Sequence, residues 1–147
     1  MLEIGDKMPV FEAPDQNGTI IKSEELIGMK TVIYFYPKDN TPGCTAEACN
    51  LRDNFMEFKA AGYNIVGISK DSVKSHKNFE TKYSLPFPLL SDPSTEILQA
   101  FGAWGEKKLY GKVSMGTLRK TFIFDEEGTL VKVIDKVNTK DHASQIL

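Results

Sequence analysis

The sequence predicts an α/β fold in which a mixed sheet lies between helices. Two continuous runs of β-branched and aromatic residues, 31–36 and 63–68, are typical of strands that are buried on both faces. Between them, apolar residues recur every three or four positions, as in an amphipathic helix. Two later apolar runs, 121–124 and 130–134, flank a Glu-Glu-Gly turn and predict an antiparallel hairpin. Strand–helix–strand order implies parallel pairing, so the sheet should contain both kinds of pair.

The first 22 residues are expected to form an extended arm. A turn at 15–18 (DQNG) separates short apolar stretches there and predicts a hairpin. Residues 23–26 resemble one helical turn that ends at Gly28. Pro37 closes the first buried strand.

Two helices are predicted in the middle of the chain. The first spans 45–61, where the apolar positions with helical spacing are Ala48, Leu51, Phe55, Phe58 and Ala61. Gly62 follows it and is a typical helix terminator. The second spans 71–84, with Asp71 or Ser72 at its N-cap.

The last part of the chain is less regular. A short strand is expected at 89–90, directly after two prolines. Asp92 and Pro93 should start another helix, because aspartate caps helices and proline suits their first position. Residues 102–118 contain four glycines and are expected to be irregular, and a final helix is expected after Thr139.

In chain order, the prediction is a hairpin, a βαβαβα stretch, a β-hairpin and a last helix. A thioredoxin-like fold has this arrangement, here with an N-terminal β-hairpin extension and an inserted helix. A chain of 147 residues fits one domain, and no repeat or linker interrupts it. Residues 1–147 are therefore expected to form a single thioredoxin-like domain.

Composition narrows the class of protein. The net charge of −2 argues against nucleic acid or an anionic membrane as an obligate partner. No segment approaches the roughly 20 apolar residues of a membrane-spanning helix, and the N-terminus does not resemble a signal peptide. A cytoplasmic location is expected, where two cysteines rarely form a structural disulfide. They are then buried fillers, metal ligands or redox groups.

Cys44 stands where a cysteine can be activated. The segment PKDNTPGCT follows a buried strand and opens a helix, so the thiol should lie in the first helical turn. Unpaired N–H groups and the helix dipole favour negative charge there. Such positions lower the pKa of a cysteine thiol from about 8.5 to roughly 3.5–7.5. An inert buried cysteine is the alternative, but two prolines and a glycine around the helix start favour a preorganised site.

Cys49 lies five residues after Cys44 on the same predicted helix. Ideal helix geometry then gives a rise of about 7.5 Å, a rotation of about 140° and a Cα separation of about 9 Å. A disulfide needs Cα atoms closer than roughly 7 Å. The two cysteines therefore cannot bond within an intact helix. The spacing permits a redox-driven local unfolding in which the first turns unwind.

A metal site is disfavoured by the sequence. Zinc sites usually draw four ligands from cysteine and histidine, and the two histidines, His76 and His142, lack neighbours at ligand spacing. Both histidines are expected to face solvent on helices. The C-x-x-C motif of disulfide oxidoreductases is also absent, because four residues separate the cysteines.

Arginine is rare in this chain. Of its 18 lysines and arginines, only Arg52 and Arg119 are arginines. Arg119 opens the strand TFIF, and its planar fork of donors could stabilise a thiolate and orient an oxygen ligand. An ordinary charge at a strand edge is the alternative. Arg52 follows Cys49 by three residues and is expected to be solvated.

These residues resemble the peroxiredoxins. The signature P-x-x-x-(T/S)-x-x-C of that family is matched by Pro37, Thr41 and Cys44. A second cysteine five residues later resembles the Q-type subgroup, also called the bacterioferritin comigratory proteins. The resemblance covers nearly the whole chain, including GDKMPVFEAPDQNG, GISKDSVKSHKNF, FPLLSDP and GTLRKTFIFDEEG. Only the short C-terminus differs.

The resemblance implies a thioredoxin-dependent thiol peroxidase. Cys44 would be the peroxidatic cysteine and become a sulfenic acid, which Cys49 would resolve into an intramolecular disulfide. Thr41 and Arg119 would donate hydrogen bonds to the thiolate and the peroxide, and Pro37 would shield the thiolate from water. Thioredoxin or a similar dithiol would reduce the disulfide, with no metal, haem or flavin. The intramolecular pair favours a monomer.

Two interpretations outside this class stay open. One is a redox sensor or chaperone-like holdase in which Cys44 and Cys49 form a switch without rapid turnover. The other is a thioredoxin-fold binding module with inert cysteines. Peroxide consumption coupled to thioredoxin oxidation separates the first from a peroxidase. Alkylation at mildly acidic pH separates the second, because an inert cysteine would not react there.

Overall fold

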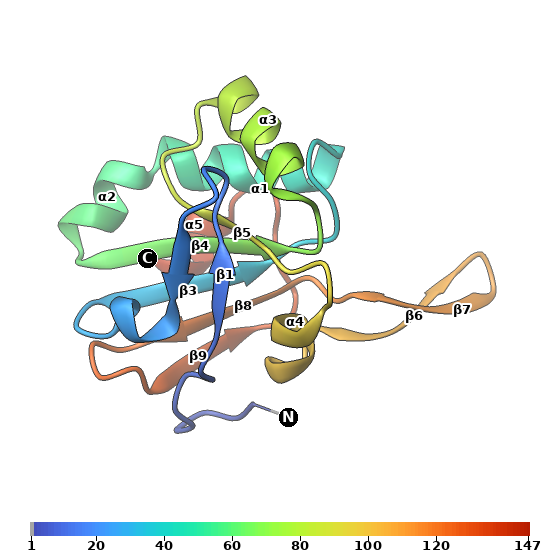
Figure 1. Ribbon diagram of the computed structural model, residues 1–147. Helices are drawn as coiled ribbons and strands as arrows, with labels where there is room; N and C mark the ends of the chain where they lie inside the picture. The colour runs from blue at the N-terminus through green and yellow to red at the C-terminus, as the bar shows by residue number, and fades with distance from the viewer. Residues whose placement is uncertain (1) are drawn as a thin grey trace.

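The centre of the molecule is a five-stranded mixed sheet with the order β5-β4-β3-β8-β9 (Figure 1). The computed structural model describes residues 2–147. The strands of this sheet are β3 Lys30–Phe35, β4 Tyr63–Ser69, β5 Leu89–Ser91, β8 Lys120–Phe124 and β9 Leu130–Ile134. β3 pairs in parallel with β4 and antiparallel with β8, so the predicted combination of both kinds of pair is confirmed.

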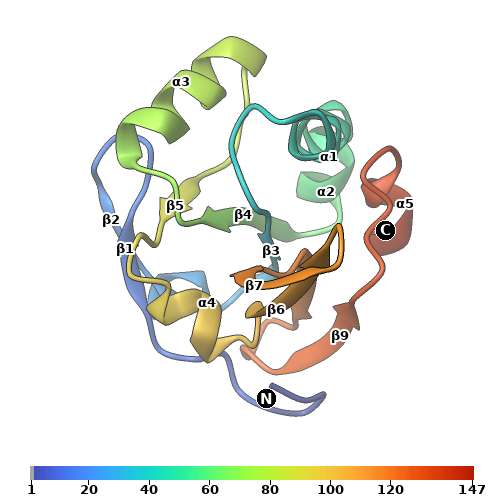
Figure 2. The same cartoon turned by 90° about the vertical axis from the view of Figure 1, so that its right-hand side faces the viewer.

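β3 is buried on both faces, as its composition predicts. Its side chains alternate between two hydrophobic clusters, because successive residues of a strand point to opposite faces. Ile33 and Phe35 belong to one cluster, with the helix α4 (Glu96–Ala100) and part of the N-terminal arm. Val32 and Tyr34 belong to the other, with side chains of four further helices. Figure 2 shows α4 on one side of the sheet and the long helices of the second cluster on the opposite side.

The helices around the second cluster are α1 Pro42–Asp53, α2 Phe55–Ala60, α3 Val73–Tyr83 and α5 His142–Ile146. The single helix predicted over 45–61 is thus two helices. They meet at Asn54, whose side-chain amide donates to the carbonyl of Asn50 at 2.8 Å and competes with the backbone ladder. The predicted cap of α3 is confirmed, because Ser72 Oγ accepts from Ser75 N at 3.1 Å.

The N-terminal hairpin agrees with the prediction, whereas the start of α4 differs from it. The N-terminal hairpin is confirmed as β1 Glu12–Pro14 and β2 Ile20–Lys22, followed by the 3₁₀ helix η1 Ser23–Leu26. α4 begins at Glu96, later than its start signal predicts. Asp92 acts from outside the helix, where its carboxylate accepts from the backbone of Leu98 at 2.9 Å.

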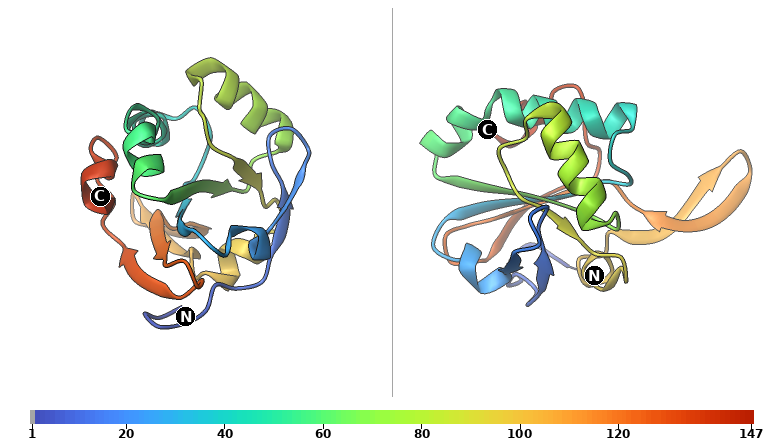
Figure 3. Two further views of the ribbon diagram at one scale, coloured as in Figure 1. Left: turned by 90° about the vertical axis from the view of Figure 1, so that its left-hand side faces the viewer. Right: turned by 45° about the horizontal axis from the view of Figure 1, so that its top comes forward.

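The prediction that residues 102–118 are irregular was wrong. They contain the hairpin β6 Trp104–Leu109 and β7 Lys112–Thr117, which projects from the body (Figures 1 and 3). Its turn has positive φ at both central residues, Tyr110 at 52° and Gly111 at 76°. Such a turn matches the twist of a tight hairpin, so this glycine serves strand pairing rather than disorder. Among residues 2–147, no helix is long and apolar enough to cross a membrane.

Candidate active site

The thiol of Cys44 lies in the first turn of α1, directly beyond the loop that follows β3. Pro42 occupies the first turn and Thr41 is the N-cap residue, so the chain enters the helix at a fixed φ. The carboxyl ends of parallel strands are where open α/β sheets place their sites, and β3 is central in the sheet. Cys44 is only 1% exposed, which keeps its sulfur away from bulk water.

Arg119 lies at the same end of the sheet as the loop that carries Cys44, because Lys120 of β8 pairs with Phe35 of β3. It directly precedes β8, which pairs with β3, and its Nη2 donates to Cys44 Sγ at 3.3 Å. Gly43 leaves room for the guanidinium, because a Cβ at that position would lie 3.3 Å from Nη2. Burial alone would lower the pKa of Arg119. The nearby Cys44 and Glu47, which attract and hydrogen-bond the guanidinium, have the larger effect and raise this pKa above its ordinary value.

Glu47 is the buried carboxyl of the site. It follows Cys44 by three residues on α1, is fully buried, and its Oε1 accepts from Arg119 Nη1 at 2.7 Å. Burial raises the pKa of Glu47 to about 7, although the Arg119 charge and hydrogen bond pull it down. The carboxyl is therefore poised to exchange a proton near neutral pH. Its Oε2 has no hydrogen-bond partner among the residues that the structure describes.

His142 closes the far side of this cluster. Its Nε2 lies 3.5 Å from Glu47 Oε2 and 2.7 Å from Thr121 Oγ1, while its Nδ1 lies 2.7 Å from Gln145 Oε1. Burial lowers the pKa of His142, which keeps the ring neutral. Because the amide oxygen only accepts, Nδ1 carries the hydrogen and Nε2 accepts from the threonine hydroxyl.

The expectation that both histidines face solvent was wrong. His76 and His142 are each fully buried. His142 begins the short helix α5, which is fixed to α1 by the Asn50 side chain: Asn50 Oδ1 accepts from Ala143 N at 2.7 Å. The five-residue helix is too short to show an apolar stripe in the sequence, so its buried face could not be predicted.

The remaining residues of the signature lie in the same loop and helix. Thr41 Oγ1 donates to the carbonyl of Lys38 at 2.9 Å and so folds the loop back on itself. Pro37 is half-buried at the exit from β3. Cys49 is half-buried within the unbroken helix α1, and both cysteines are free thiols. This is the arrangement in which the helical spacing keeps the two sulfurs apart.

Arg52 does not join the site. Its Nη1 donates to the carbonyl of Tyr83 at 2.7 Å, and its guanidinium pairs with Asp53. It ties α1 to the end of α3, although its side chain stays 32% exposed, so the expected solvated side chain is confirmed only in part. Neither Glu47 nor His142 was expected at this site from the sequence. Glu47 had a signal, since it stands one turn from Cys44 beside the buried Ala48.

The raised pKa of Glu47 carries a prediction about stability. Between its ordinary pKa of 4.5 and about 7, the folded state holds a proton that the unfolded chain has released. The resulting stabilisation is complete below the ordinary pKa and is lost as the pH rises through about 7. We expect the free energy of unfolding of the wild type to fall by about 2–3 kcal/mol, relative to Glu47→Gln, from about pH 5 to about pH 8. Urea denaturation of both proteins measures it, and a constant difference would contradict the raised pKa.

The sequence of the chain matches a known protein family. The AhpC/TSA family model matches residues 4–133. The chain belongs to the AhpC/TSA family. Peroxiredoxin Bcp of Bacillus subtilis is 44% identical over 146 residues, which cover 99% of this AhpC/TSA chain and 93% of the relative. Peroxiredoxin Bcp of Escherichia coli is 41% identical, over 99% of this chain and 94% of the relative.

Solved structures of AhpC/TSA relatives have the same fold. The bacterioferritin comigratory protein of Xanthomonas campestris, studied for alkyl peroxide reduction, gives a TM-score of 0.87 at 40% identity over 92% of this chain and 87% of that one. A mutant of Xylella fastidiosa PrxQ gives 0.92 at 30% identity over 99% and 93%. The predicted family and thioredoxin-like fold are therefore confirmed. This AhpC/TSA chain is a peroxiredoxin, an enzyme that reduces peroxides with a thiol.

Proposed function

We propose that Cys44 is the peroxidatic thiol of this enzyme. Its thiolate attacks the terminal oxygen of a hydroperoxide, the S–O bond forms as the O–O bond breaks, and the leaving oxygen departs with the bonding electrons. That oxygen takes up a proton and leaves as water or an alcohol, while Cys44 becomes a sulfenic acid. The observation that carries the proposal is the hydrogen bond from Arg119 Nη2 to the buried Cys44 Sγ, at 3.3 Å.

Arg119 has two roles in this proposal. Its charge stabilises the thiolate before the reaction, and its fork of donors stabilises negative charge on the leaving oxygen as the O–O bond breaks. Glu47 holds the guanidinium in place through the 2.7 Å contact with Nη1, which leaves Nη2 directed at the sulfur. Thr41 would turn its hydroxyl from the Lys38 carbonyl to the peroxide, and Pro37 limits access of water.

Cys49 completes the proposed cycle. Its thiol attacks the sulfur of the Cys44 sulfenic acid, a disulfide forms, and the sulfenic oxygen leaves as water. The first turn of α1 unwinds for this step, because the helical spacing exceeds the reach of a disulfide. A dithiol protein such as thioredoxin then gives two electrons to the disulfide by thiol–disulfide exchange, which regenerates both thiols and leaves the reductant as a disulfide.

The proposed cycle uses only protein thiols and the peroxide. Both cysteines come from one chain, so a monomer suffices. The dithiol reductants that it needs maintain thiols in the cytoplasm, which is where we place the protein. A redox sensor with the same disulfide would differ in one measurement, because it would not oxidise thioredoxin continuously in the presence of peroxide.

Replacing the resolving thiol tests the second half of the cycle. We expect Cys49→Ser to react with one equivalent of peroxide and then stop, so that sulfenic acid accumulates on Cys44. Dimedone labelling followed by mass spectrometry measures it. Wild type should label weakly because it proceeds to the disulfide, and Cys44→Ser should not label. If Cys49→Ser consumes peroxide yet gives no adduct, the resolving role is wrong.

A further inference from the structure

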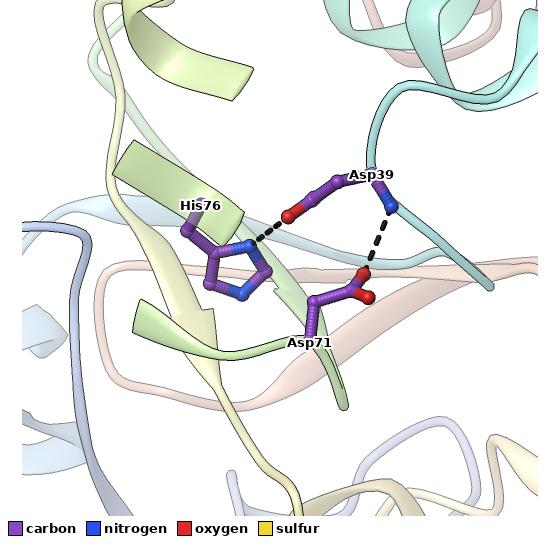
Figure 4. A group of neighbouring side chains, drawn as sticks. All are labelled: Asp39, Asp71 and His76. Atoms are coloured by element: carbon purple, nitrogen blue, oxygen red, sulfur yellow. Dashed lines mark hydrogen bonds and ion pairs between the residues drawn. The ribbon is translucent and has the colours of Figure 1, made fainter. Parts of the chain in front are cut away.

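A second buried polar network lies in the loop that carries the chain from β3 to Cys44. At its centre is Asp39, whose side chain is 4% exposed. Its carboxylate accepts three hydrogen bonds: Oδ1 from Tyr36 Oη at 2.6 Å, and Oδ2 from Ser75 Oγ and His76 Nδ1, each at 2.7 Å. Figure 4 shows the imidazole directed at this carboxylate. Ser75 and His76 belong to α3, so the network joins the loop to that helix.

The backbone of the same loop residue is held as well. Asp39 N donates to Asp71 Oδ2 at 2.9 Å, and that oxygen also accepts from Ser69 Oγ at 2.8 Å (Figure 4). His76 is fixed at its other nitrogen, since Nε2 lies 3.0 Å from the carbonyl of Leu90. The carbonyl only accepts, so Nε2 carries a hydrogen, and a further proton lies between Nδ1 and the carboxylate.

The distances between these atoms fit hydrogen bonds and do not fit a zinc site. Asp39, Asp71 and His76 do offer ligand atoms within 4.8 Å of one another. A tetrahedral zinc ion with ligands at about 2.0–2.1 Å would hold a nitrogen and an oxygen about 3.3 Å apart. The His76 Nδ1 and Asp39 Oδ2 atoms are 2.7 Å apart, which leaves room for a proton alone. Asp71 Oδ2 already accepts hydrogen bonds from Asp39 N and Ser69 Oγ.

The network determines where α1 begins. Asp39 precedes the N-cap Thr41 by two residues, and between them Asn40 has a left-handed φ of 59°, so the chain turns sharply. Asn40 Oδ1 accepts from Lys82 Nζ at 3.3 Å and Tyr83 Oη at 3.1 Å. The loop is thus bound to α3 at two successive residues. The first turn of α1 therefore begins directly after an anchored loop.

We propose that Asp39, with its donors Tyr36, Ser75 and His76, is a latch that holds the first turn of α1 closed and so sets how fast oxidised Cys44 meets its resolving partner. These are positioning residues, because they act through the loop, while the hydrogen bond to the sulfur comes from Arg119. The inference rests on the proposed function, in which the first turn must open.

The latch has a chemical consequence because two reactions compete for the sulfenic acid. Attack by the Cys49 thiol forms the disulfide and releases water. Reaction with a second hydroperoxide adds one oxygen to the sulfur, breaks the O–O bond, and gives a sulfinic acid and an alcohol or water. A closed helix start prevents the first reaction and allows the second. A weaker latch should therefore favour the disulfide and protect Cys44 from overoxidation.

Single donors of the latch can be removed with little change of shape. Tyr36→Phe deletes one hydroxyl that donates to Asp39, and Ser75→Ala deletes another. Asp39→Asn keeps the size of the acceptor and removes its charge. Ser72→Ala is the matched control, because it removes the N-cap hydrogen bond of the same helix, α3, without touching Asp39.

Two measurements on these variants test the proposal. In the reduced protein, hydrogen–deuterium exchange over residues 40–46 should rise about two- to tenfold for each single-donor variant, which is the usual effect of one net hydrogen bond. On peroxide titration, the ratio of Cys44 sulfinic acid to Cys44–Cys49 disulfide should fall by a similar factor. Ser72→Ala should leave both readouts within about a factor of two of the wild type.

The exchange measurement and the product ratio together show which part of the proposal fails. Unchanged exchange over residues 40–46 in Tyr36→Phe, Ser75→Ala and Asp39→Asn would overturn the latch. Faster exchange with an unchanged or increased sulfinic acid fraction would overturn its effect on the competing reactions. An equal response of Ser72→Ala would show general loosening of α3 and also overturn it. A wild type that forms no disulfide would instead refute the proposed function, while the exchange arm would still report on the latch.

Discussion

Cys44→Ser is expected to abolish peroxide reduction. Serine has nearly the same size and a hydroxyl in place of the thiol, so the buried first turn of α1 should keep its structure. The hydroxyl does not ionise near neutral pH and is a weak nucleophile without a strong base beside it. We expect the rate constant for peroxide consumption to fall by more than about 10³-fold, to the uncatalysed background. Rapid-mixing kinetics with hydrogen peroxide and an organic hydroperoxide measure it.

The control for this result is Cys49→Ser, which removes the other thiol from the same helix. It should retain the fast first reaction and lose only continued turnover with thioredoxin. Circular dichroism and thermal unfolding of both variants establish that each is folded. Turnover that persists in Cys44→Ser would mean that another group reduces the peroxide.

Arg119→Met should cause the second-largest loss. Methionine fills most of the space of the arginine stem but cannot donate to the sulfur or to the leaving oxygen. Removing one donor that stabilises a developing oxyanion typically costs about 10²–10³-fold, so we expect kcat/KM for peroxide to fall by this amount. Arg119→Lys keeps the charge but not the fork of donors, so its kcat/KM should lie between that of the wild type and that of Arg119→Met. Steady-state kinetics coupled to thioredoxin measure these values.

The chain offers a matched control in its other arginine. Arg52 lies on α1 itself, but its Nη1 donates to the Tyr83 carbonyl and not to Cys44. Arg52→Met should therefore change kcat/KM by less than about threefold. Equal losses in Arg52→Met and Arg119→Met would show that general destabilisation, and not the contact with the thiol, explains the effect.

Glu47 complicates the reading of Arg119→Met, because that variant leaves a buried carboxyl without its partner. Glu47→Gln combined with Arg119→Met separates the two effects. If Glu47 acts by orienting the guanidinium, its substitution should lower kcat/KM in the wild type and have little effect in Arg119→Met. Such non-additivity is expected for groups in one contact network.

Much of the fold could be predicted because local signals agree with the long-range packing. The strand around Ile33 is β-branched or aromatic from Thr31 to Phe35, and the structure buries it on both faces. The cap of α3 at Ser72 and the turn of the N-terminal hairpin are local features that the sequence carries directly. The helix break at Asn54 was missed because it depends on one side-chain amide that bonds to a nearby carbonyl.

The parts that could not be predicted depend on contacts between distant segments. The hairpin β6–β7 has glycines within its strands, which weaken every compositional signal for a strand. Burial of His76 depends on a carboxylate 37 residues earlier in the chain. The Arg119 contact with Cys44 spans 75 residues, so the sequence could offer Arg119 only as a candidate partner of the thiol, with an ordinary strand-edge charge as the alternative. Glu47 was missed despite its position one turn from Cys44, because a carboxylate on a helix is usually solvated.

The most direct test is peptide mapping of the protein after one equivalent of peroxide. Cleavage after Glu47 places Cys44 and Cys49 on separate peptides, so a disulfide between them appears as one linked pair. A mixture of unlabelled and ¹⁵N-labelled protein distinguishes bonds within a chain from bonds between chains. We expect linked pairs of uniform label only, with no disulfide in Cys44→Ser. Linked pairs of mixed label, or an unlinked Cys49 thiol after full oxidation of Cys44, would contradict the proposed cycle.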